Sequence, residues 1–512
     1  MLKMKEFCAD YIFLTFKIDI FYCLCNKSAM LSLLTRMRKI GRLIYILGIL
    51  FATSLASCMD DESYSSSEAC LLTFSEDTIE MDTLFSHVPS VTRAFWIYNH
   101  SDANLKFSVK LKDGNQSGFR VNVDGVDLVR NGYQFPDIEV RKNDSIRAYV
   151  ELTASQGGEK TPRKISDALE FSLNSGRKQN VILNAWSWNA IILHSLNVVR
   201  DTILSSESPV VVYGGIHVAP GATLTIGAGE RLFFHEDAAL TVEGTLKIEG
   251  NKEHRVAVRG DRLDRMFTDL SYDDTPGRWR GIRFSKESCG NSISYADIHG
   301  AYDGIVCDSS IQEVEKLSLD HSMVHNCQGY GLELHHSQVN VQNCQITNAQ
   351  NDCVVVDGGH VTFNDCTLAQ FYPFSARRGV ALRFVAGKSD WSLNVKNSIL
   401  TGYADDELKG EVGEDSTKWN YCFEDCMIRT PRVETPDSSH FVHVYYEDVK
   451  DTIQYGEKHF VNIDTKHFKY DFHLAKTSAA IGKGNRETSL PTDCTGRVRD
   501  EEPDLGCFEY KE

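Results

Sequence analysis

A short pattern that returns at steps of about 22 residues constrains the fold of this chain more than any other feature. The stretch VNVQNCQI at residues 339–346 is followed by VTFNDCTL at residues 361–368. Both copies alternate apolar and polar residues, then place Asn or Asp before a small residue, a spacer and an aliphatic residue. Such self-similarity is typical of a solenoid, in which each unit buries its apolar side only by stacking on the next unit.

The copies continue upstream and downstream, and their last aliphatic residues give an alignment. These residues are Ile298, Val324, Ile346, Leu368, Leu400 and Ile428. A second track, GIRF, GIVC, GLEL, CVVV and ALRF, begins at residues 281, 304, 331, 353 and 381 and places its apolar side chains two apart. A period of two indicates β-strands, because successive side chains point to opposite faces. Two or three short strands per repeat predict a parallel β-helix rather than a leucine-rich horseshoe.

The N-terminal residues read as a targeting segment. A basic stretch, RMRKIGR at 36–42, precedes the apolar run LIYILGILFATS at 43–54 and the box LASC at 55–58. This arrangement resembles the bacterial lipoprotein signal, and the resemblance implies that Cys58 is lipidated and that residues 1–57 are leader and signal peptide. A transmembrane anchor is the alternative, but the apolar run is shorter than the roughly 20 residues that a membrane span needs. We therefore expect membrane association through a lipid anchor.

Residues 58–69 contain MDDESYSSSE, an acidic and serine-rich stretch of the composition expected for a disordered tether. It also resembles the acidic signal that directs some Gram-negative lipoproteins to the outer face of the outer membrane, although a plain linker is the alternative. The expected location is therefore the outer membrane, at the cell surface.

Charge excludes one class of partner. The chain has a formal net charge of −17, and without residues 1–57 it keeps 46 basic and 68 acidic residues, which gives −22. Nucleic acid is not an expected partner, because binding phosphate requires a basic face. An anionic polysaccharide would also be repelled unless a local basic patch attracts it.

Residues 70–187 lack the repeat and contain about seven short alternating strands separated by polar turns. This pattern predicts an immunoglobulin-like β-sandwich. The phrases LTFSEDTIEMDTLFS, TRAFWIYNHSD and FRVNVDG, and the Gly-rich coil that begins YGGIHVAPGATLTIGAGERL, resemble bacterial right-handed β-helix lipoproteins with a pectate-lyase-like coil. The resemblance covers most of residues 70–400 and implies that the sandwich is a spacer and that residues 196–470 are the β-helix. The predicted fold class is all-β, a right-handed parallel β-helix preceded by an immunoglobulin-like β-sandwich.

Residues 471–512 resemble the closing module of many bacterial β-helix proteins. The module reads D-x-x-G-x-x-R, then D-x-G, then E-Y, and is matched here by Asp493, Gly496, Arg499, Asp504, Gly506, Glu509 and Tyr510. We expect this segment to cap the last rung, whose backbone groups would otherwise pair with another chain. Cys494 and Cys507 are additions within the module, and we predict a disulfide between them that contributes about 3 kcal/mol. Cys344, Cys366 and Cys426 occupy small-residue positions of the repeat, which indicates internal stacking.

A β-helix suggests polysaccharide cleavage, since lyases of this architecture generally hold calcium with clustered carboxylates. Stacked positions of successive rungs can be read as columns. One column runs Arg283, Val306, Glu333, Val355, Arg383; a second runs Asp320, Gln342, Asn364, Lys396, Glu424; and the turn position beside it runs His321, Asn343, Asp365, Asn397, Asp425. No column brings three carboxylates together, whereas a hard cation needs six or more oxygens. The columns predict no metal site, no cofactor and no catalytic residues on these faces.

The strongest ligand-binding candidate is the excursion at 262–278, which leaves the coil and returns at GRWRGIRF. It supplies a possible sugar platform and an acidic group, and the next coil adds further polar residues. The candidates are Asp269, Asp273, Asp274, Arg278, Trp279, Arg280, Asp297, His299 and Asp303. The alternatives are that Trp279 packs beneath the excursion and that the Asp residues only make local turn hydrogen bonds.

The sequence thus predicts a lipid-anchored cell-envelope protein that is non-catalytic and uses its β-helix to bind a polysaccharide or an envelope protein. The alternative is a polysaccharide lyase or glycoside hydrolase. An aromatic row along one flank favours binding, and a cleft with converging Asp and Arg favours catalysis.

Overall fold

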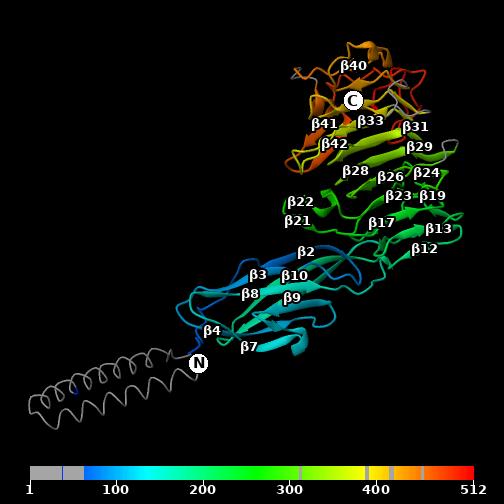
Figure 1. Ribbon diagram of the computed structural model, residues 1–512. Helices are drawn as coiled ribbons and strands as arrows, with labels where there is room; N and C mark the ends of the chain where they lie inside the picture. The colour runs from blue at the N-terminus through cyan, green and yellow to red at the C-terminus, as the bar shows by residue number, and fades with distance from the viewer. Residues whose placement is uncertain are drawn as a thin grey trace, which may run out of the picture.

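A computed structural model describes residues 37, 63–310, 314–386, 391–413, 420–450 and 455–511. These residues form a β-sandwich followed by a long parallel coil, and the two bodies meet end to end (Figure 1). Cys58, the predicted lipidation site, and nearly all of the predicted leader lie outside the described residues. None of the helices in the described ranges is long and apolar enough to cross a membrane.

The N-terminal body contains two five-stranded sheets, ordered β1-β3-β8-β5-β6 and β2-β10-β9-β4-β7. All strand pairs are antiparallel except β10 with β2. The strands are β1 (Thr73–Phe74), β2 (Thr78–Phe85), β3 (Arg93–Asn99), β4 (Leu105–Leu111), β5 (Phe119–Val123), β6 (Val126–Asp127), β7 (Gln134–Val140), β8 (Asp144–Leu152), β9 (Arg163–Leu173) and β10 (Lys178–Trp188). Alternate residues of both sheets fill one apolar core between them. The sandwich predicted from the sequence is confirmed.

Residues 63–69 were expected to belong to a disordered tether, and here the structure differs. Tyr64 forms a parallel bridge to Asn104, and its ring lies under the ammonium group of Lys106 at 5.4 Å. This part of the segment therefore packs on the sandwich, because its one aromatic residue finds a cationic partner there.

The coil is built from parallel strands whose rungs stack along its axis (Figure 1). One side is an eleven-stranded sheet of β11 (Ile191–Leu193), β14 (Val210–Val212), β17 (Arg231–Phe234), β20 (Val256–Gly260), β25 (Ala296–His299), β28 (Met323–Cys327), β30 (Gln345–Ala349), β32 (Thr367–Gln370), β35 (Ile399–Gly402), β38 (Met427–Ile428) and β40 (Tyr445–Tyr446). We call it the eleven-stranded face.

The remaining two sides of the coil share one seventeen-stranded sheet, because the longest strands bend across both sides. Its strands are β12 (Leu196–Val198), β13 (Thr202–Leu204), β15 (Ile216–Val218), β16 (Thr223–Ile226), β18 (Leu240–Val242), β19 (Thr245–Glu249), β23 (Ile282–Phe284), β24 (Asn291–Ser294), β26 (Ile305–Cys307), β27 (Glu315–Asp320), β29 (Leu332–Gln342), β31 (Val354–Asn364), β33 (Leu382–Ala386), β34 (Ser392–Lys396), β36 (Leu408–Val412), β37 (Tyr421–Glu424) and β39 (Phe441–Val442).

The register predicted from the repeat is confirmed rung by rung. Each residue of the alignment from Ile298 to Ile428 pairs with the next one on the eleven-stranded face. The columns that begin at Arg283 and Asp320 also hold throughout. The inward residues form one continuous apolar core from Val198 to Ile428.

The corner between the two sheets is a ladder of left-handed turn residues. The φ angle lies between 45° and 52° in all of them: Tyr295, His321, Asn343, Asp365, Asn397, Asp425 and His443. Asn, Asp and His are enriched in this region of backbone space. Through most of this ladder, each backbone N–H donates to a carbonyl of the next rung, as from His321 to Gln342. The turn position identified in the sequence is therefore a structural column.

The C-terminal segment differs from its prediction as a cap on the last rung. It runs back along the turn ladder, because its polar groups match the outward side chains of that ladder. The contacts are Asn485 with Asp425 and Asn397, Ser489 and Leu490 with Asp365, Arg499 with Asn343, and Thr492 with His321. Residues 485–499 thus form a belt along the flank of the coil.

Residues 460–474 form an antiparallel hairpin of β41 (Phe460–Asp464) and β42 (Lys469–Leu474). The sequence assigned residues up to 470 to the β-helix and the rest to the capping segment, so the hairpin spans that predicted boundary. The hairpin lies beside the coil (Figure 1). Together with residues 480–508 it packs on the outer side of the eleven-stranded face and forms an apolar cluster there with Phe371, Ile399 and Met427. This second layer explains why β30, β32 and β35 are buried on both faces.

The predicted disulfide is not formed in the structure, where Cys494 and Cys507 are buried free thiols. The two residues are nonetheless neighbours, since the Cys494 N–H donates to the Cys507 carbonyl at 2.7 Å. The bond itself stays a prediction. Cys344, Cys366 and Cys426 are also buried and free, as expected for internal stacking.

Candidate functional site

The excursion after β20 folds back against the eleven-stranded face. It contains the hairpin β21 (Arg265–Phe267) and β22 (Leu270–Ser271), followed by the 3₁₀ turn η3 (Tyr272–Asp274). The hydroxyl of Ser271 accepts a hydrogen bond from the Asp273 N–H at 3.1 Å, which caps the turn. This cap fixes Asp273 where it reaches the strand β25.

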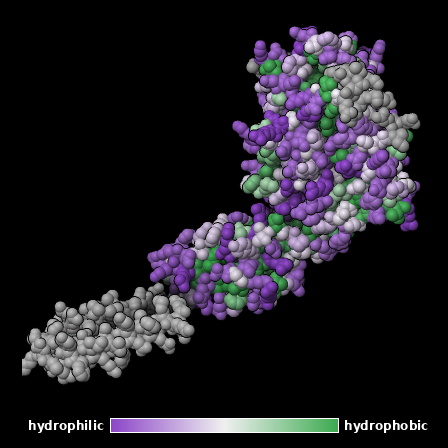
Figure 2. Space-filling view, in the orientation of Figure 1, coloured by the Kyte–Doolittle hydropathy of each residue, from purple (hydrophilic) through white to green (hydrophobic). Residues whose placement is uncertain are grey.

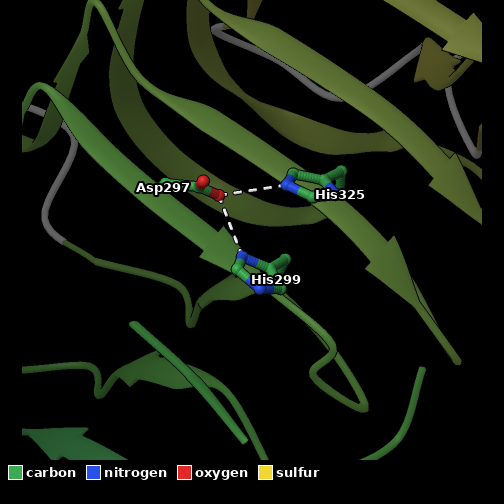
Figure 3. A group of neighbouring side chains, drawn as sticks. All are labelled: Asp297, His299 and His325. Carbon is green, nitrogen blue, oxygen red and sulfur yellow. Dashed lines mark hydrogen bonds and ion pairs between the residues drawn. The ribbon is translucent and has the colours of Figure 1, made fainter. Parts of the chain in front are cut away.

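Two histidines and one aspartate meet on neighbouring strands of this face. Asp297 and His299 are two apart on β25, so their side chains share one side of the sheet, and His325 is the partner of His299 on β28. Asp297 Oδ1 lies 2.9 Å from His299 Nδ1 and 3.0 Å from His325 Nε2. The two rings stack with centroids 4.8 Å apart. Figure 3 shows both rings directed at the Asp297 carboxylate.

Two further charged side chains, Asp273 and Arg259, extend this group. Asp273 Oδ1 lies 2.8 Å from His299 Nε2 and 2.5 Å from Arg259 Nη1. Arg259 belongs to β20, so the network joins three successive rungs and the excursion. His299 is therefore held at both ring nitrogens by carboxylates. We call Arg259, Asp273, Asp297, His299 and His325 the Asp–His cluster.

The electrostatics of the cluster favour charged carboxylates and a protonated His299. Burial alone lowers the pKa of His299, but Asp297 and Asp273 raise it to about 9. Burial raises the pKa of Asp297, but His299 and His325 hold it well below its usual range. The pKa of Asp273 is also lowered, since the hydrogen bond from His299 and the charge of Arg259 outweigh burial. By contrast, burial and the charge of Asp273 raise the pKa of Asp274.

The cluster opens on a cleft of about 300 Å³ between the eleven-stranded face and the hairpin β41–β42. His325 and Asp274 border it at the cluster end. One wall is aromatic and comprises Phe468, Tyr470, Phe472 and Phe508. The opposite wall is polar and comprises Asn326, Gln345, Thr347 and Asn348 from β28 and β30. We call this space the hairpin cleft.

One buried polar group in the hairpin cleft has no hydrogen-bond partner among the described residues. The Tyr470 hydroxyl is buried and makes no hydrogen bond. A buried polar group without a partner costs about 1–3 kcal/mol. Such groups are expected where a ligand supplies the missing hydrogen bonds.

The structure separates the predicted ligand-binding residues into two sets. Asp273, Asp297 and His299 come together, with Asp274 beside them. Asp269 is exposed on the excursion, Asp303 caps a turn by accepting from the Tyr330 N–H at 2.9 Å, and neither contacts the cluster. The predicted acidic residues therefore come together only in part.

The predicted tryptophan and arginines lie away from the Asp–His cluster. Trp279 is 1% exposed, stacks on Phe234 at 4.7 Å and donates to the His299 carbonyl. It is a core residue beneath the excursion and offers no sugar platform, because the apolar ring is the inward residue of its rung. Arg278 and Arg280 line a separate cavity of about 420 Å³, where Arg280 pairs with the exposed Asp237.

Arg259 and His325 belong to the cluster and were not identified from the sequence. The signal for His325 was present, because the alignment pairs Ile298 with Val324 and so places the following residues, His299 and His325, side by side. No such signal existed for Arg259, since its contact with Asp273 depends on how the excursion folds back. Among the described residues, Asp297, His299 and His325 form the one group of three potential metal ligands whose donor atoms lie within 4.8 Å of one another.

Comparison with known proteins supports the architecture. Residues 200–368 match the family model described as the right handed beta helix region. This match, with the stacked parallel rungs, shows a right-handed parallel β-helix and confirms the predicted fold class. No curated protein matches the chain.

Several solved structures resemble about a quarter of the chain. The PapD-like domain 7 of human CEP192 is 11% identical, with 25% of this chain and 90% of that chain covered and a TM-score of 0.17. The MSP family member WR4 of C. elegans is 12% identical, with 23% and 96% covered and a TM-score of 0.16. The CooA pilin subunit of enterotoxigenic Escherichia coli is 10% identical, with 23% and 97% covered and a TM-score of 0.16. None of these likenesses supports an argument about function.

Proposed function

We propose that the protein binds a polysaccharide in the hairpin cleft. The observation that carries the proposal is the pairing of an aromatic wall, which includes the unpartnered Tyr470 hydroxyl, with a polar wall across the cleft. The Phe468 ring is stacked on Phe374 at 5.0 Å, and the Tyr470 ring on Phe472 at 6.1 Å. These two stacks hold rings of the aromatic wall in place, and aromatic rings that line a cleft are expected of a sugar-binding surface.

A sugar ring suits both walls. Its C–H faces pack on aromatic rings, and its hydroxyls both donate and accept hydrogen bonds. On the polar wall the Gln345 amide donates to the Thr347 hydroxyl at 3.0 Å, which leaves its carbonyl oxygen for a ligand. Because the chain without residues 1–57 has a formal net charge of −22, a neutral glycan is favoured over a polyuronate.

The cellular setting is part of the proposal. The resemblance of residues 36–58 to a lipoprotein signal supports lipidation at Cys58 and display on the outer membrane. Hydrophilic residues cover most of the face of the coil seen in Figure 2, as expected of a body exposed to water. Protease added to intact cells should release the folded body, and Cys58→Ala should free it from membranes. Protection in intact cells with cleavage after lysis would place the protein on the inner side instead.

Binding is tested by isothermal titration of the purified protein with neutral oligosaccharides, pectin fragments and glycosaminoglycan fragments. Tyr470→Phe removes only the unpartnered hydroxyl, so the fold should persist while the affinity falls about 3–10-fold, the value of one hydrogen bond. The matched control is Tyr149→Phe, which removes a hydroxyl from an exposed ring of the sandwich. Equal affinities for the wild type and Tyr470→Phe would contradict binding in this cleft.

A polysaccharide lyase or hydrolase is the second candidate. It is favoured by the convergence of Arg259, Asp273 and Asp297 around His299, next to His325, which borders the cleft. Acid–base cleavage of a sugar requires such groups close together. The same panel should be incubated with the protein with and without calcium. New reducing ends or unsaturated products that disappear in Asp273→Asn would replace the binding function with the enzymatic one.

A further inference from the structure

We infer that Asp297, His299 and His325 bind one divalent transition-metal ion of the zinc class. This site goes beyond the proposed function, because glycan binding in the hairpin cleft does not depend on it. The three residues supply two imidazole nitrogens and one carboxylate oxygen from two adjacent rungs. Three protein ligands with one position left for water is the arrangement of an open zinc site.

Two of the three donor–donor distances are close to those that a metal needs. A tetrahedral ion with bonds of about 2.0–2.1 Å sets neighbouring ligand atoms about 3.3 Å apart. The Asp297 oxygen already lies 2.9 Å and 3.0 Å from the two nitrogens. All three donor atoms lie within 4.8 Å of one another, so closing them around an ion at 3.3 Å spacing requires side-chain movements of at most about 1.5 Å. Figure 3 shows the three side chains converging.

The surroundings of His299 match those of a metal-bound imidazole. A metal-ligating histidine generally donates its other ring N–H to a carboxylate, which fixes its tautomer. Here that role falls to Asp273, which lies 2.8 Å from Nε2 and leaves Nδ1 for the ion. Arg259 fixes Asp273 in turn at 2.5 Å. The ion replaces the proton on Nδ1, and Asp273 keeps the proton on Nε2.

The donor set selects the class of ion. Imidazole suits zinc, copper, iron and nickel, whereas calcium and magnesium require oxygen ligands in larger number. The single carboxylate and two imidazoles therefore disfavour the calcium expected of a β-helix lyase. His325 borders the hairpin cleft, and its side chain is 23% exposed, so an ion can enter from solvent.

Zinc alone is the probe. Untagged protein is stripped with chelator, dialysed, titrated with zinc against a chromophoric chelator and analysed for metal content. We expect one equivalent per chain in the wild type and a loss of affinity of about 10–100-fold or more in His325→Gln. That variant should fold, because His325 is partly exposed. Cobalt should give visible absorption in the wild type and lose it in the variant.

His335→Gln is the matched control, since His335 also contacts two carboxylates, Glu333 and Asp357, on the other sheet. It should bind zinc like the wild type. Two results would overturn the site: no bound zinc in the wild type at micromolar zinc, or equal zinc affinity in His325→Gln and His335→Gln. Either result would leave the Asp–His cluster as an ion network that fastens the excursion. Glycan titration of the same metal-free samples tests the cleft separately.

Discussion

Replacing Val341 by Asp tests the coil register most directly. Val341 is fully buried, and its neighbours on the adjacent rungs are Leu319 and Phe363. Losing the buried apolar side chain costs about 1.5–3 kcal/mol. Holding an aspartic acid protonated at pH 7, about three pH units above its usual pKa, costs about 4 kcal/mol. A neutral carboxyl without a hydrogen-bond partner adds about 1–3 kcal/mol.

The expected loss for Val341→Asp is therefore about 6–10 kcal/mol at pH 7, a large part of the roughly 5–15 kcal/mol that stabilises a domain. The sign of the pH dependence follows from burial, which raises the folded-state pKa of the new carboxyl. Destabilisation is then smallest below about pH 4 and grows as pH rises. Lowering the pH from 7 to 4 should recover about 4 kcal/mol relative to the control.

The control is Gln342→Asp, one residue further on the outward side of the same strand. It places a charge beside Asp320 and should cost less than about 1 kcal/mol at either pH. Urea unfolding followed by circular dichroism and tryptophan fluorescence measures both variants. Equal losses, or a loss for Val341→Asp that does not change between pH 4 and pH 7, would show that Val341 does not point into the coil.

Three further predictions concern the cluster, the excursion and the belt. His299 has a folded-state pKa raised to about 9, so in metal-free protein its stabilising contribution should be complete below about pH 6.5 and lost as pH rises through about 9; His299→Gln should flatten this loss in thermal melts. Trp279→Ala should cost about 3–5 kcal/mol of unfolding free energy because it empties a core site, whereas Arg280→Ala should change it by less than about 0.5 kcal/mol. Oxidation should join Cys494 to Cys507 and raise the melting temperature, and mass spectrometry that finds both thiols alkylatable after oxidation would contradict this pairing.

The rungs of the coil could be predicted because a local rule generates them. The pairings from Ile298 to Ile428 follow from a period of two within a strand and a repeat between strands, both visible in the residues themselves. The same rule placed His299 beside His325, although only the first was chosen as a candidate. The repeat does not predict the path of segments that leave the coil.

The site was predicted only in part for that reason. Whether Asp273 reaches His299 depends on the path of the excursion, which the hydrogen bond from the Asp273 N–H to the Ser271 hydroxyl helps to fix. Trp279 was ambiguous because a large aromatic residue beside arginines fits both a core and a platform. The hairpin cleft could not be found at all, since its aromatic wall comes from residues 468–508, more than a hundred positions from its polar wall.

The belt along the turn ladder has a consequence for the order in which the chain can mature. Residues 485–499 supply partners to turn residues from Asp425 back to His321, across sequence separations of 60 to 171 residues. During synthesis these rungs emerge long before the belt does. Until the belt arrives, the turn ladder and the outer side of β30, β32 and β35 remain exposed to solvent. A nascent chain halted before residue 485 would therefore expose the turn ladder and this outer side of the sheet to chaperones and proteases. Contacts between residues so far apart in sequence also slow folding. This flank of the coil can therefore complete its hydrogen bonds only after residues 485–499 have been synthesised.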